Sequence, residues 1–404
     1  SVSGALWCSI LELSAHVSLF QFAQRINQAH SMLRLYVTVM SHADLTGRVL
    51  VTGAAGFIGS HLCRRLLSDG AQVRALDNLS TGTEASIADI MHSERFEFTL
   101  GDVREQKQVE SLLDGSTAVF HLAANPEVRA ALSDGEIDFE QNLRSTHVLL
   151  EAMRAKSWRG TLIFTSTSTV YGDATQLPTP EKYGPLVPIS MYGATKLGCE
   201  ALITANSHLL GLKACIFRFA NVVGPGSGHG VIHDFLTKLS QNPARLEVLG
   251  DGTQTKSYIY IEDCIDAFIH ATKHGDENPG IYNVGTDDQT DVKTIANIVI
   301  QEMGLRDVQI GFKPGPEGRG WPGDVKHMLL DISKLRTLGW SPRYRSTDAV
   351  RKATEQLVKE GKHESIFRLY HMLQLTSRIL SFDESDFANE LFAWIVFQRT
   401  DLFL

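Results

Sequence analysis

The sequence has few cysteines and no long apolar run, and these absences exclude whole classes of protein. Its five cysteines are scattered over 404 residues and form no C-x-x-C pair. This pattern is typical of reduced core thiols in a cytosolic protein, not of a disulfide-stapled secreted scaffold. No apolar run reaches the ~18 residues that a membrane-spanning helix needs. The sequence therefore predicts a cytoplasmic protein without a membrane segment.

Basic charge and metal-ligand spacing are also missing. The net charge is −8 and the isoelectric point is about 6.0, whereas a nucleic-acid partner requires a basic face. The 15 histidines show no spacing typical of metal ligands. We therefore expect neither nucleic acid nor a metal ion as a partner.

What the sequence does contain is a regular alternation of short apolar segments and amphipathic ones. Strand-like runs lie at 48–52, 72–76, 96–100, 118–122, 161–165 and 214–219, and helical runs at 60–68, 141–155 and 192–210. Alternation of this kind predicts an α/β fold with a doubly wound parallel sheet of the Rossmann type. Such sheets bind ligands at the carboxyl ends of their strands.

The distribution of these patterns and motifs divides the chain into four segments. Residues 47–225 are expected to form the Rossmann domain, and residues 226–361 a smaller α/β substrate domain in which 256–270 returns to the first. Residues 1–46 carry none of the motifs and are expected to be an extension, either non-native or disordered. Residues 362–404 are expected to be a second extension without an assigned role.

A glycine turn follows the first apolar run. Gly53 permits a tight turn, Gly56 lets the backbone approach a pyrophosphate, and Gly59 lets the next helix pack on the strand. Phe57 and Ile58 lie between them, at a helix N-terminus whose N–H groups favour phosphate. A glycine trio alone also fits an ordinary strand–helix turn. The strand and helix on either side favour a dinucleotide site.

The second strand-like run ends in Asp77, and this residue discriminates between cofactors. A carboxylate at that position accepts hydrogen bonds from the adenosine ribose and repels a 2′-phosphate. Arg74 lies inside the strand, and no arginine directly follows Asp77. The sequence therefore predicts NAD and not NADP.

Tyr192 and Lys196 are spaced to lie one helical turn apart on the same face. A free phenol is a poor base at neutral pH, and a nearby ammonium lowers its pKa. Hydroxyls gather at the end of the fifth strand-like run, from Thr165 to Thr169, and one of them could pass a substrate proton toward Tyr192. A solvated helix pair and the β-propensity of threonine are the alternatives to this interpretation.

Further motifs accompany these residues. They are Asp77-Asn78-Leu79-Ser80-Thr81-Gly82, Gly101-Asp102-Val103-Arg104, His121-Leu122-Ala123-Ala124, Arg218-Phe219-Ala220-Asn221-Val222-Val223-Gly224-Pro225, Gly250-Asp251-Gly252-Thr253-Gln254-Thr255-Lys256 and Gly323-Asp324-Val325. In combination, roughly from residue 46 to 358, the chain resembles the extended short-chain dehydrogenases/reductases of the nucleotide-sugar epimerase/dehydratase branch. Within that branch it resembles UDP-glucose 4-epimerases of bacteria and archaea.

The resemblance implies a role for each matching position. The implied catalytic residues are Thr167, Tyr192 and Lys196. The implied cofactor-binding residues are Gly53, Gly56, Phe57, Ile58, Gly59, Asp77, Asn78, Asp102, Val103, Ala123, Ala124, Asn142, Tyr192 and Lys196. The implied substrate-binding residues are Thr169, Asn221, Lys256 and Arg319. His121 is expected to be a packed residue at a strand end.

One position departs from the family pattern. Many epimerases have an arginine where this chain has Trp321, and the nearest arginine is Arg319, which could reach a diphosphate from a shifted turn. Met328 stands where relatives size the sugar pocket. Because methionine is flexible, it does not decide whether acetylated sugars are accepted.

The expected activity is NAD-dependent 4-epimerisation of a nucleotide sugar, with interconversion of UDP-glucose and UDP-galactose through a 4-keto intermediate. The alternatives are a nucleotide-sugar 4,6-dehydratase or decarboxylase, and a catalytically silent NAD-binding regulator. The resemblance also implies a homodimer formed through the helices at 141–155 and 192–210.

Overall fold

A parallel seven-stranded sheet forms the centre of the molecule, which a computed structural model describes over residues 43–361. Its strand order is β11-β6-β5-β4-β1-β2-β3. The strands are β1 (Arg48–Thr52), β2 (Gln72–Asp77), β3 (Phe96–Leu100), β4 (Ser116–His121), β5 (Thr161–Thr167), β6 (Lys213–Phe219) and β11 (Gly280–Val284). The predicted doubly wound α/β fold is confirmed. The seventh strand, β11, lies beyond the segment 256–270 that was expected to return to this domain.

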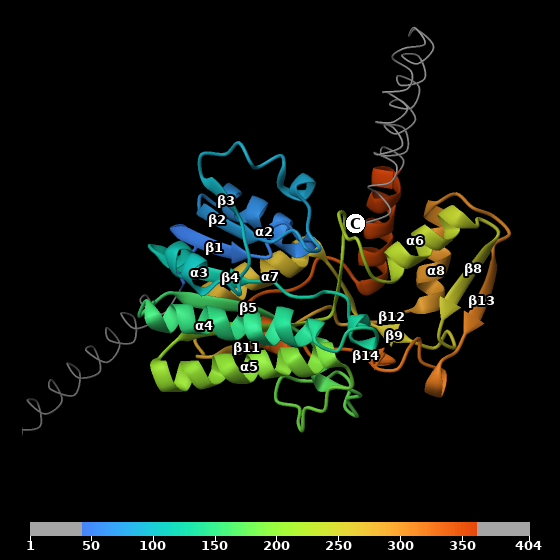
Figure 1. Ribbon diagram of the computed structural model, residues 1–404. Coiled ribbons are helices and arrows are strands. Elements are labelled where there is room, and N and C mark those ends of the chain that lie inside the picture. The colour runs from blue at the N-terminus through green and yellow to red at the C-terminus, as the bar shows by residue number, and fades with distance from the viewer. Residues whose placement is uncertain (1–42, 362–404) are drawn as a thin grey trace, which may run out of the picture.

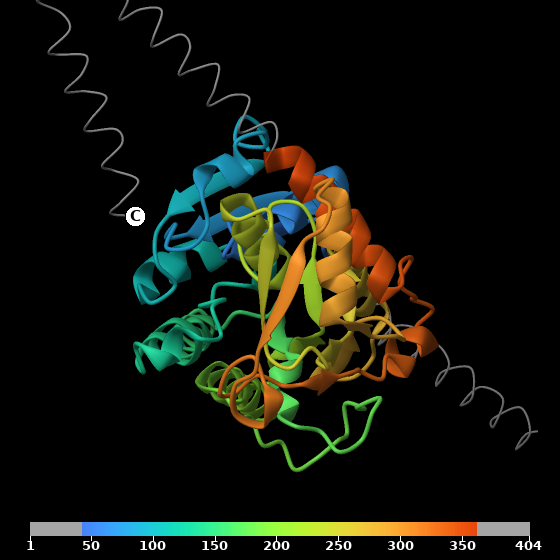
Figure 2. The same ribbon diagram turned by 90° about the vertical axis from the view of Figure 1, so that its right-hand side faces the viewer.

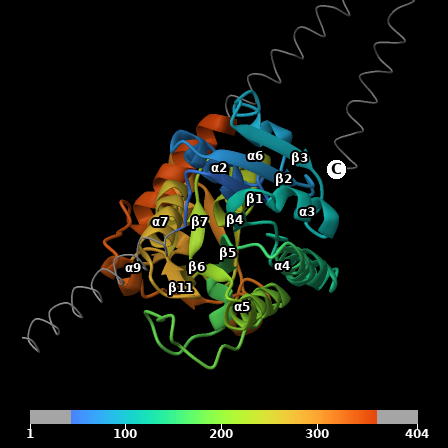
Figure 3. The same ribbon diagram turned by 90° about the vertical axis from the view of Figure 1, so that its left-hand side faces the viewer.

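Helices cover both faces of this sheet (Figure 3). One face packs against α2 (Phe57–Ser68) and α7 (Ile261–His274), and the other against α3 (Gln106–Leu113), α4 (Ser145–Ala155) and α5 (Met191–Leu210). The side chains of β1 alternate accordingly, because Val49 and Val51 join the first core cluster and Leu50 joins the second. Burial on both faces explains why the strands are continuous apolar runs in the sequence.

A smaller α/β unit lies beside the carboxyl ends of the sheet strands (Figures 1 and 2). It contains α6 (Val231–Gln241), α8 (Val292–Glu302) and the parallel pair β8 (Arg245–Leu249) and β13 (Gln309–Lys313). A small sheet has the order β12-β9-β14, with β12 (Thr290–Asp291), β9 (Thr255–Lys256) and β14 (His327–Met328). The strands β7 (Asn221–Val223) and β10 (Tyr258–Tyr260) form a further parallel pair. The short helix α9 (Ser333–Thr337) follows, and a last helix covers 346–361.

Two helices differ from the sequence prediction in ways that concern the site. Helix α2 begins at Phe57, three residues before the predicted start, because Gly56 in an extended conformation ends the turn directly before it. The helix predicted at 141–155 is two elements, since the π-helix η3 (Phe139–Arg144) precedes α4. Helix α5 begins as expected, and the hydroxyl of Ser190 accepts from the backbone N–H of Gly193 at 3.1 Å.

The two expected extensions, 1–46 and 362–404, fall almost entirely outside the described residues. Leu45 is an exception, because it is 3% exposed and belongs to the core cluster on the α2 face of the sheet. The folded core therefore begins before residue 47.

Candidate active site

A cleft of about 960 Å³ lies between the carboxyl ends of the sheet strands and the smaller unit. Most of the residues predicted to bind cofactor or substrate line it. They are Gly53, Gly56, Phe57, Ile58, Gly59, Asp77, Asn78, Asp102, Val103, Ala123, Ala124, Thr167, Thr169, Tyr192, Lys196, Asn221 and Lys256. Asn142 and Arg319 do not line it. The fold thus gathers residues that are up to about 200 positions apart in the sequence into one cavity.

The glycine turn has the tightness that a phosphate cradle needs. Gly53 has a φ of +71°, and a Cβ there would stand 2.7 Å from the backbone nitrogen of Ala123. A Cβ on Gly59 would collide with the carbonyl oxygen of Gly53, so only glycine lets α2 pack this closely on the turn. The N-terminal N–H groups of α2 have no intrahelical acceptors. This arrangement fits a dinucleotide pyrophosphate at the cleft surface.

Asp77, at the end of β2, contacts the backbone of the glycine turn. Its carboxylate accepts from the backbone N–H of Ala55 at 2.9 Å and from that of Leu79 at 2.8 Å, one on each oxygen. The side chain is almost fully buried, yet it reaches the cleft. Each oxygen keeps a second acceptor site, which suits a ribose diol and disfavours a 2′-phosphate.

Tyr192 and Lys196 lie on α5 at the centre of the cleft. The Nζ of Lys196 donates to the carbonyl of Thr165 at 2.9 Å and stands 6.0 Å from the ring centre of Tyr192. Burial lowers the pKa of Lys196 to about 8. Burial also raises the pKa of Tyr192, with a smaller contribution from the charge of Asp138. Desolvation of the phenolate is the largest cause of this upward shift, and the expected lowering of the phenol pKa by Lys196 stays a prediction.

A pair of threonine hydroxyls lies where β5 ends and the 3-10 turn η4 (Ser168–Tyr171) begins. The Oγ1 atoms of Thr167 and Thr169 are 3.0 Å apart, and the backbone N–H of Thr169 donates to Thr167 Oγ1 at 3.2 Å. Both residues line the cleft. The pair can hold a substrate hydroxyl and relay its proton along a defined direction.

His121 is a packed residue, as the sequence analysis expected. Its Nδ1 bonds Thr52 Oγ1 at 2.8 Å and its Nε2 bonds Thr146 Oγ1 at 3.1 Å. Complete burial, with a smaller contribution from the charge of Lys196, lowers the pKa of His121 to about 3. The imidazole is therefore neutral at physiological pH and connects β1, β4 and α4.

Asn142 acts behind the cleft and not in its wall. It is 1% exposed, its Oδ1 accepts from the N–H of Asn125 at 2.9 Å, and its Nδ2 donates to Thr195 Oγ1 at 3.2 Å. The same amide donates to Asp138 Oδ1 at 3.3 Å. The side chain thus ties the π-helix to α5 beside Lys196. A direct cofactor contact stays a prediction.

Arg319 is held away from the cleft. Its guanidinium pairs with Asp173 at 2.8 Å and with Glu317 at 3.0 Å, and it donates to the carbonyl of Asp324 at 2.7 Å. Trp321 lines the cleft instead. The geometry therefore does not support the expected contact of Arg319 with a diphosphate. Lys256 does line the cleft, where its Nζ pairs with Asp324 Oδ1 at 2.6 Å.

A buried ion pair that the sequence did not predict lies beneath α5. Arg218 on β6 pairs with Glu200 on α5 at 2.6 Å, and both side chains are 4% exposed. Glu200 also accepts from the hydroxyl of Ser166, next to Thr167. The available signal was the position of Glu200, one helical turn after Lys196. Its partner is distant in sequence and could not be found from spacing.

Comparison with known proteins identifies the family of this chain. The sequence profile of the NAD dependent epimerase/dehydratase family matches residues 49–285. The chain belongs to this family.

The relatives align with more than three quarters of this chain and with nearly their own full length. A putative UDP-glucose 4-epimerase of Methanocaldococcus jannaschii is 32% identical over 319 residues, which are 78% of this chain and 99% of that protein. A solved UDP-galactose 4-epimerase structure is 40% identical, with a TM-score of 0.68, over 78% of this chain and 99% of that one. The Thermus thermophilus UDP-glucose 4-epimerase in complex with NAD is 31% identical, with a TM-score of 0.67, over 77% and 98%.

The family is NAD dependent, which agrees with the cofactor predicted from Asp77. Within residues 43–361, no helix of this epimerase/dehydratase family member is long and apolar enough to cross a membrane. No group of three His, Cys, Asp or Glu side chains in that range could hold a metal ion.

Proposed function

We propose that this chain is an NAD-dependent nucleotide-sugar 4-epimerase that interconverts UDP-glucose and UDP-galactose. The observation that carries the proposal is one cleft containing a dinucleotide turn, a Tyr192–Lys196 pair and the Thr167 hydroxyl. Relatives named UDP-glucose 4-epimerase that align over nearly their full length support the substrate class.

In this mechanism the residues of α5 and β5 move one proton. Thr167 orients the C4 hydroxyl and Tyr192 takes its proton, with Lys196 stabilising the phenolate. Because burial raises the pKa of Tyr192, the phenolate needs positive charge close by. NAD held at the glycine turn would supply that charge, and would accept the C4 hydride and give it back to the opposite face of the ketone. Tyr192 then returns the proton after the ketone has turned.

The remaining residues anchor the substrate while the sugar rotates. Asn221 and Lys256 line the cleft on the side of the smaller unit, and we expect them to hold the diphosphate. The Lys256–Asp324 pair gives this ammonium a fixed position. The hydroxyl of Thr169 bonds that of Thr167 and helps to orient it toward the sugar. A diphosphate anchor with room beyond it lets both faces of C4 reach the same donor.

Elimination chemistry is the alternative within the same family. A solved dTDP-glucose 4,6-dehydratase of Streptomyces venezuelae is 27% identical to this chain. Dehydration needs a general acid and a base near C5 and C6, and the residues after Thr167 are Ser168 and Thr169. Hydroxyls with a pKa far above neutrality cannot replace carboxylates in these roles. The site therefore favours epimerisation.

Product analysis without added NAD tests the proposal. The full chain is incubated with UDP-glucose, UDP-galactose and a panel of GDP- and dTDP-sugars, and products are separated by chromatography and weighed. We expect a C4 epimer of unchanged mass from the UDP-hexoses. Loss of water or carbon dioxide would identify an eliminating or decarboxylating enzyme. Absence of any product while NAD stays bound would favour a regulator.

We also propose that the chain forms a homodimer through α4 and α5 and acts in the cytoplasm. These helices lie side by side on one face of the sheet (Figure 3), and Leu209 at the end of α5 is 81% exposed. The four cysteines within residues 43–361 are free and buried, which fits a reducing compartment. Light scattering should give the mass of two chains, and a monomer would contradict the dimer.

A further inference from the structure

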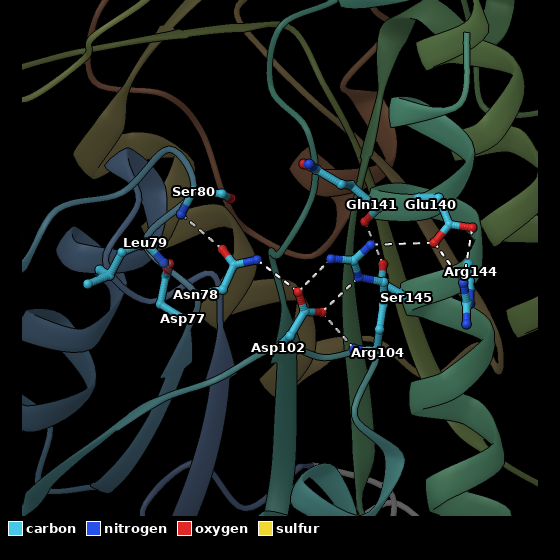
Figure 4. Close-up of polar contacts among 10 residues, drawn as sticks. All are labelled: Asp77, Asn78, Leu79, Ser80, Asp102, Arg104, Glu140, Gln141, Arg144 and Ser145. Atoms are coloured by element: carbon cyan, nitrogen blue, oxygen red, sulfur yellow. Dashed lines mark hydrogen bonds and ion pairs between the residues drawn. The ribbon is translucent and has the colours of Figure 1, made fainter. Parts of the chain in front are cut away.

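Arg218 lies on β6, directly before the cleft-lining residues 219–221, and the mechanism above gives it no role. Its side chain is 4% exposed. By contrast, the side chains of the Arg104–Glu140 pair, which joins the loop after β3 to the π-helix, are 35% and 29% exposed (Figure 4). A charge that is removed from water is stable only when its partners hold it closely. The partners of Arg218 therefore show which elements it orders.

These partners lie on three separate segments of the chain. Nε and Nη2 of Arg218 donate to the carboxylate of Glu200 on α5, at 3.0 and 2.6 Å. Nη1 donates to the hydroxyl of Tyr171 in η4 at 3.0 Å, and to the carbonyl oxygen of Glu181 at 3.1 Å. Glu181 lies in the segment that connects η4 to α5. Because the donors of a guanidinium form a rigid planar fork, one side chain fixes all three segments relative to β6.

Glu200 extends this arrangement to β5. Its carboxylate also accepts from the hydroxyl of Ser166, which directly precedes Thr167. Successive side chains of a strand alternate in direction, so an anchor at Ser166 restrains the direction of Thr167. Glu200 itself lies one helical turn after Lys196 on α5. One carboxylate thus connects the strand end of the threonine with the helix of the catalytic pair.

Tyr171 extends the arrangement to η4. Its hydroxyl accepts from Arg218 and donates to Oδ1 of Asn283 on β11 at 2.7 Å. The residue is 3% exposed, and Thr169 lies two positions before it in the same turn. Since Thr169 and Thr167 form the hydroxyl pair at 3.0 Å, both members of that pair are anchored to the same guanidinium.

We propose that Arg218 is a positioning residue, and that it holds the two threonine hydroxyls in register with Tyr192 for proton transfer. Glu200 and Tyr171 transmit this restraint. Proton transfer requires hydrogen-bond reach, so a small displacement of the hydroxyls lowers the rate of this step. The restraint acts beside the sugar and not at the glycine turn or the diphosphate anchor, so it raises kcat without changing nucleotide affinity. This inference rests on the proposed epimerase function.

Steady-state kinetics of the full chain with UDP-galactose, in water and in deuterium oxide, test the proposal. Ser166→Ala and Tyr171→Phe each remove one anchor and should lower kcat about tenfold, with bound NAD and the calorimetric affinity for UDP unchanged. The solvent isotope effect on kcat should rise in both variants, because the proton step has become slower. The matched control is Tyr260→Phe, whose buried hydroxyl donates to the side-chain amide of Gln356 outside the cleft. It should also lower the midpoint of urea unfolding, but should keep the wild-type kcat.

Arg218→Lys keeps a positive charge beside Glu200 and loses the fork that reaches three segments. We expect it to lower kcat about a hundredfold, more than either hydroxyl variant. Wild-type kcat in any of the three variants would overturn the proposal and leave the epimerase function intact. A lowered kcat with an unchanged solvent isotope effect places the defect outside proton transfer and equally contradicts it. A wild-type chain that epimerises no UDP-sugar refutes the proposed function, and this inference with it.

Discussion

The chemistry of the cleft depends on single groups whose ionisation is set by burial. Burial favours the neutral form of both Tyr192 and Lys196, since it raises the pKa of the phenol and lowers that of the amine. An acid–base pair of this kind responds strongly to a charge that arrives with a ligand. Substitutions of these two residues therefore test the proposed mechanism most directly.

Removing the phenol oxygen should abolish proton transfer and leave the fold unchanged. We expect Tyr192→Phe to lower kcat by roughly 10³-fold or more while the protein keeps its NAD, because the essential acid–base group is lost. Steady-state kinetics with UDP-galactose measure the effect. The matched control is Tyr183→Phe, which removes a hydroxyl that bonds Thr175 outside the cleft. Turnover near that of the wild type in Tyr192→Phe would refute the assignment.

His121 predicts a component of acid destabilisation. Burial lowers the pKa of His121 from 6.5 to about 3, so between these values the unfolded chain binds a proton that the folded protein does not. The free energy of unfolding should therefore fall as pH falls through this window, by about 1.4 kcal/mol per unit for this group. Denaturant unfolding at pH 7 and pH 5 measures the slope. His121→Gln should make it shallower, and an identical slope would contradict a buried neutral imidazole.

Among the elements, most of the main sheet could be predicted from the sequence, whereas side-chain contacts between distant segments could not. Apolar runs bounded by turns identified six of its strands, because burial on both faces leaves a continuous signal. Strand β11 (Gly280–Val284) was missed, since it is a short run far from the regular alternation. The glycine turn, Asp77 and the Tyr192–Lys196 pair were found because each is local. Glu200–Arg218 and Arg104–Glu140 join distant segments, and only the fold brings them together.

The turn between β1 and α2 should tolerate no side chain at Gly59. We expect Gly59→Ala to lower the free energy of unfolding by about 2 kcal/mol or more and to release NAD, because the added Cβ collides with the Gly53 carbonyl. Gly135→Ala is the control, since a Cβ there meets nothing within 4 Å, and it should change stability by less than about 0.5 kcal/mol. Chemical denaturation compares the two. Equal stabilities would show that α2 can move away from the turn.

The attachment of α5 to the sheet depends on a buried ion pair. Glu200→Ala leaves Arg218 buried without its carboxylate, so we expect a loss of ~3–5 kcal/mol in unfolding free energy. In contrast, Glu97→Ala removes the 63% exposed partner of Arg74 and should cost less than about 1 kcal/mol. Urea unfolding of both variants gives the comparison. A small loss in Glu200→Ala would mean that water or another group reaches the guanidinium.

At the scale of the whole molecule, one cleft joins the sheet edge to the smaller unit. The glycine turn follows β1, Asp77 ends β2, and Tyr192 and Lys196 lie on α5, whereas Lys256 and Trp321 come from the smaller unit. We propose that this division separates hydride transfer, beside the sheet, from substrate anchoring on the smaller unit. In that proposal a keto sugar held by its diphosphate presents either face to the same hydride donor.

The most direct test of this account follows the hydrogen at C4. The full chain is incubated, without added NAD, with UDP-galactose carrying deuterium at C4, and the recovered UDP-glucose is examined by mass spectrometry and NMR. We expect UDP-glucose of unchanged mass with the deuterium still at C4, because the same hydride leaves and returns while Tyr192 exchanges only the hydroxyl proton. Deuterium lost to solvent, deuterium found at C6, or a product lighter by one water would contradict it.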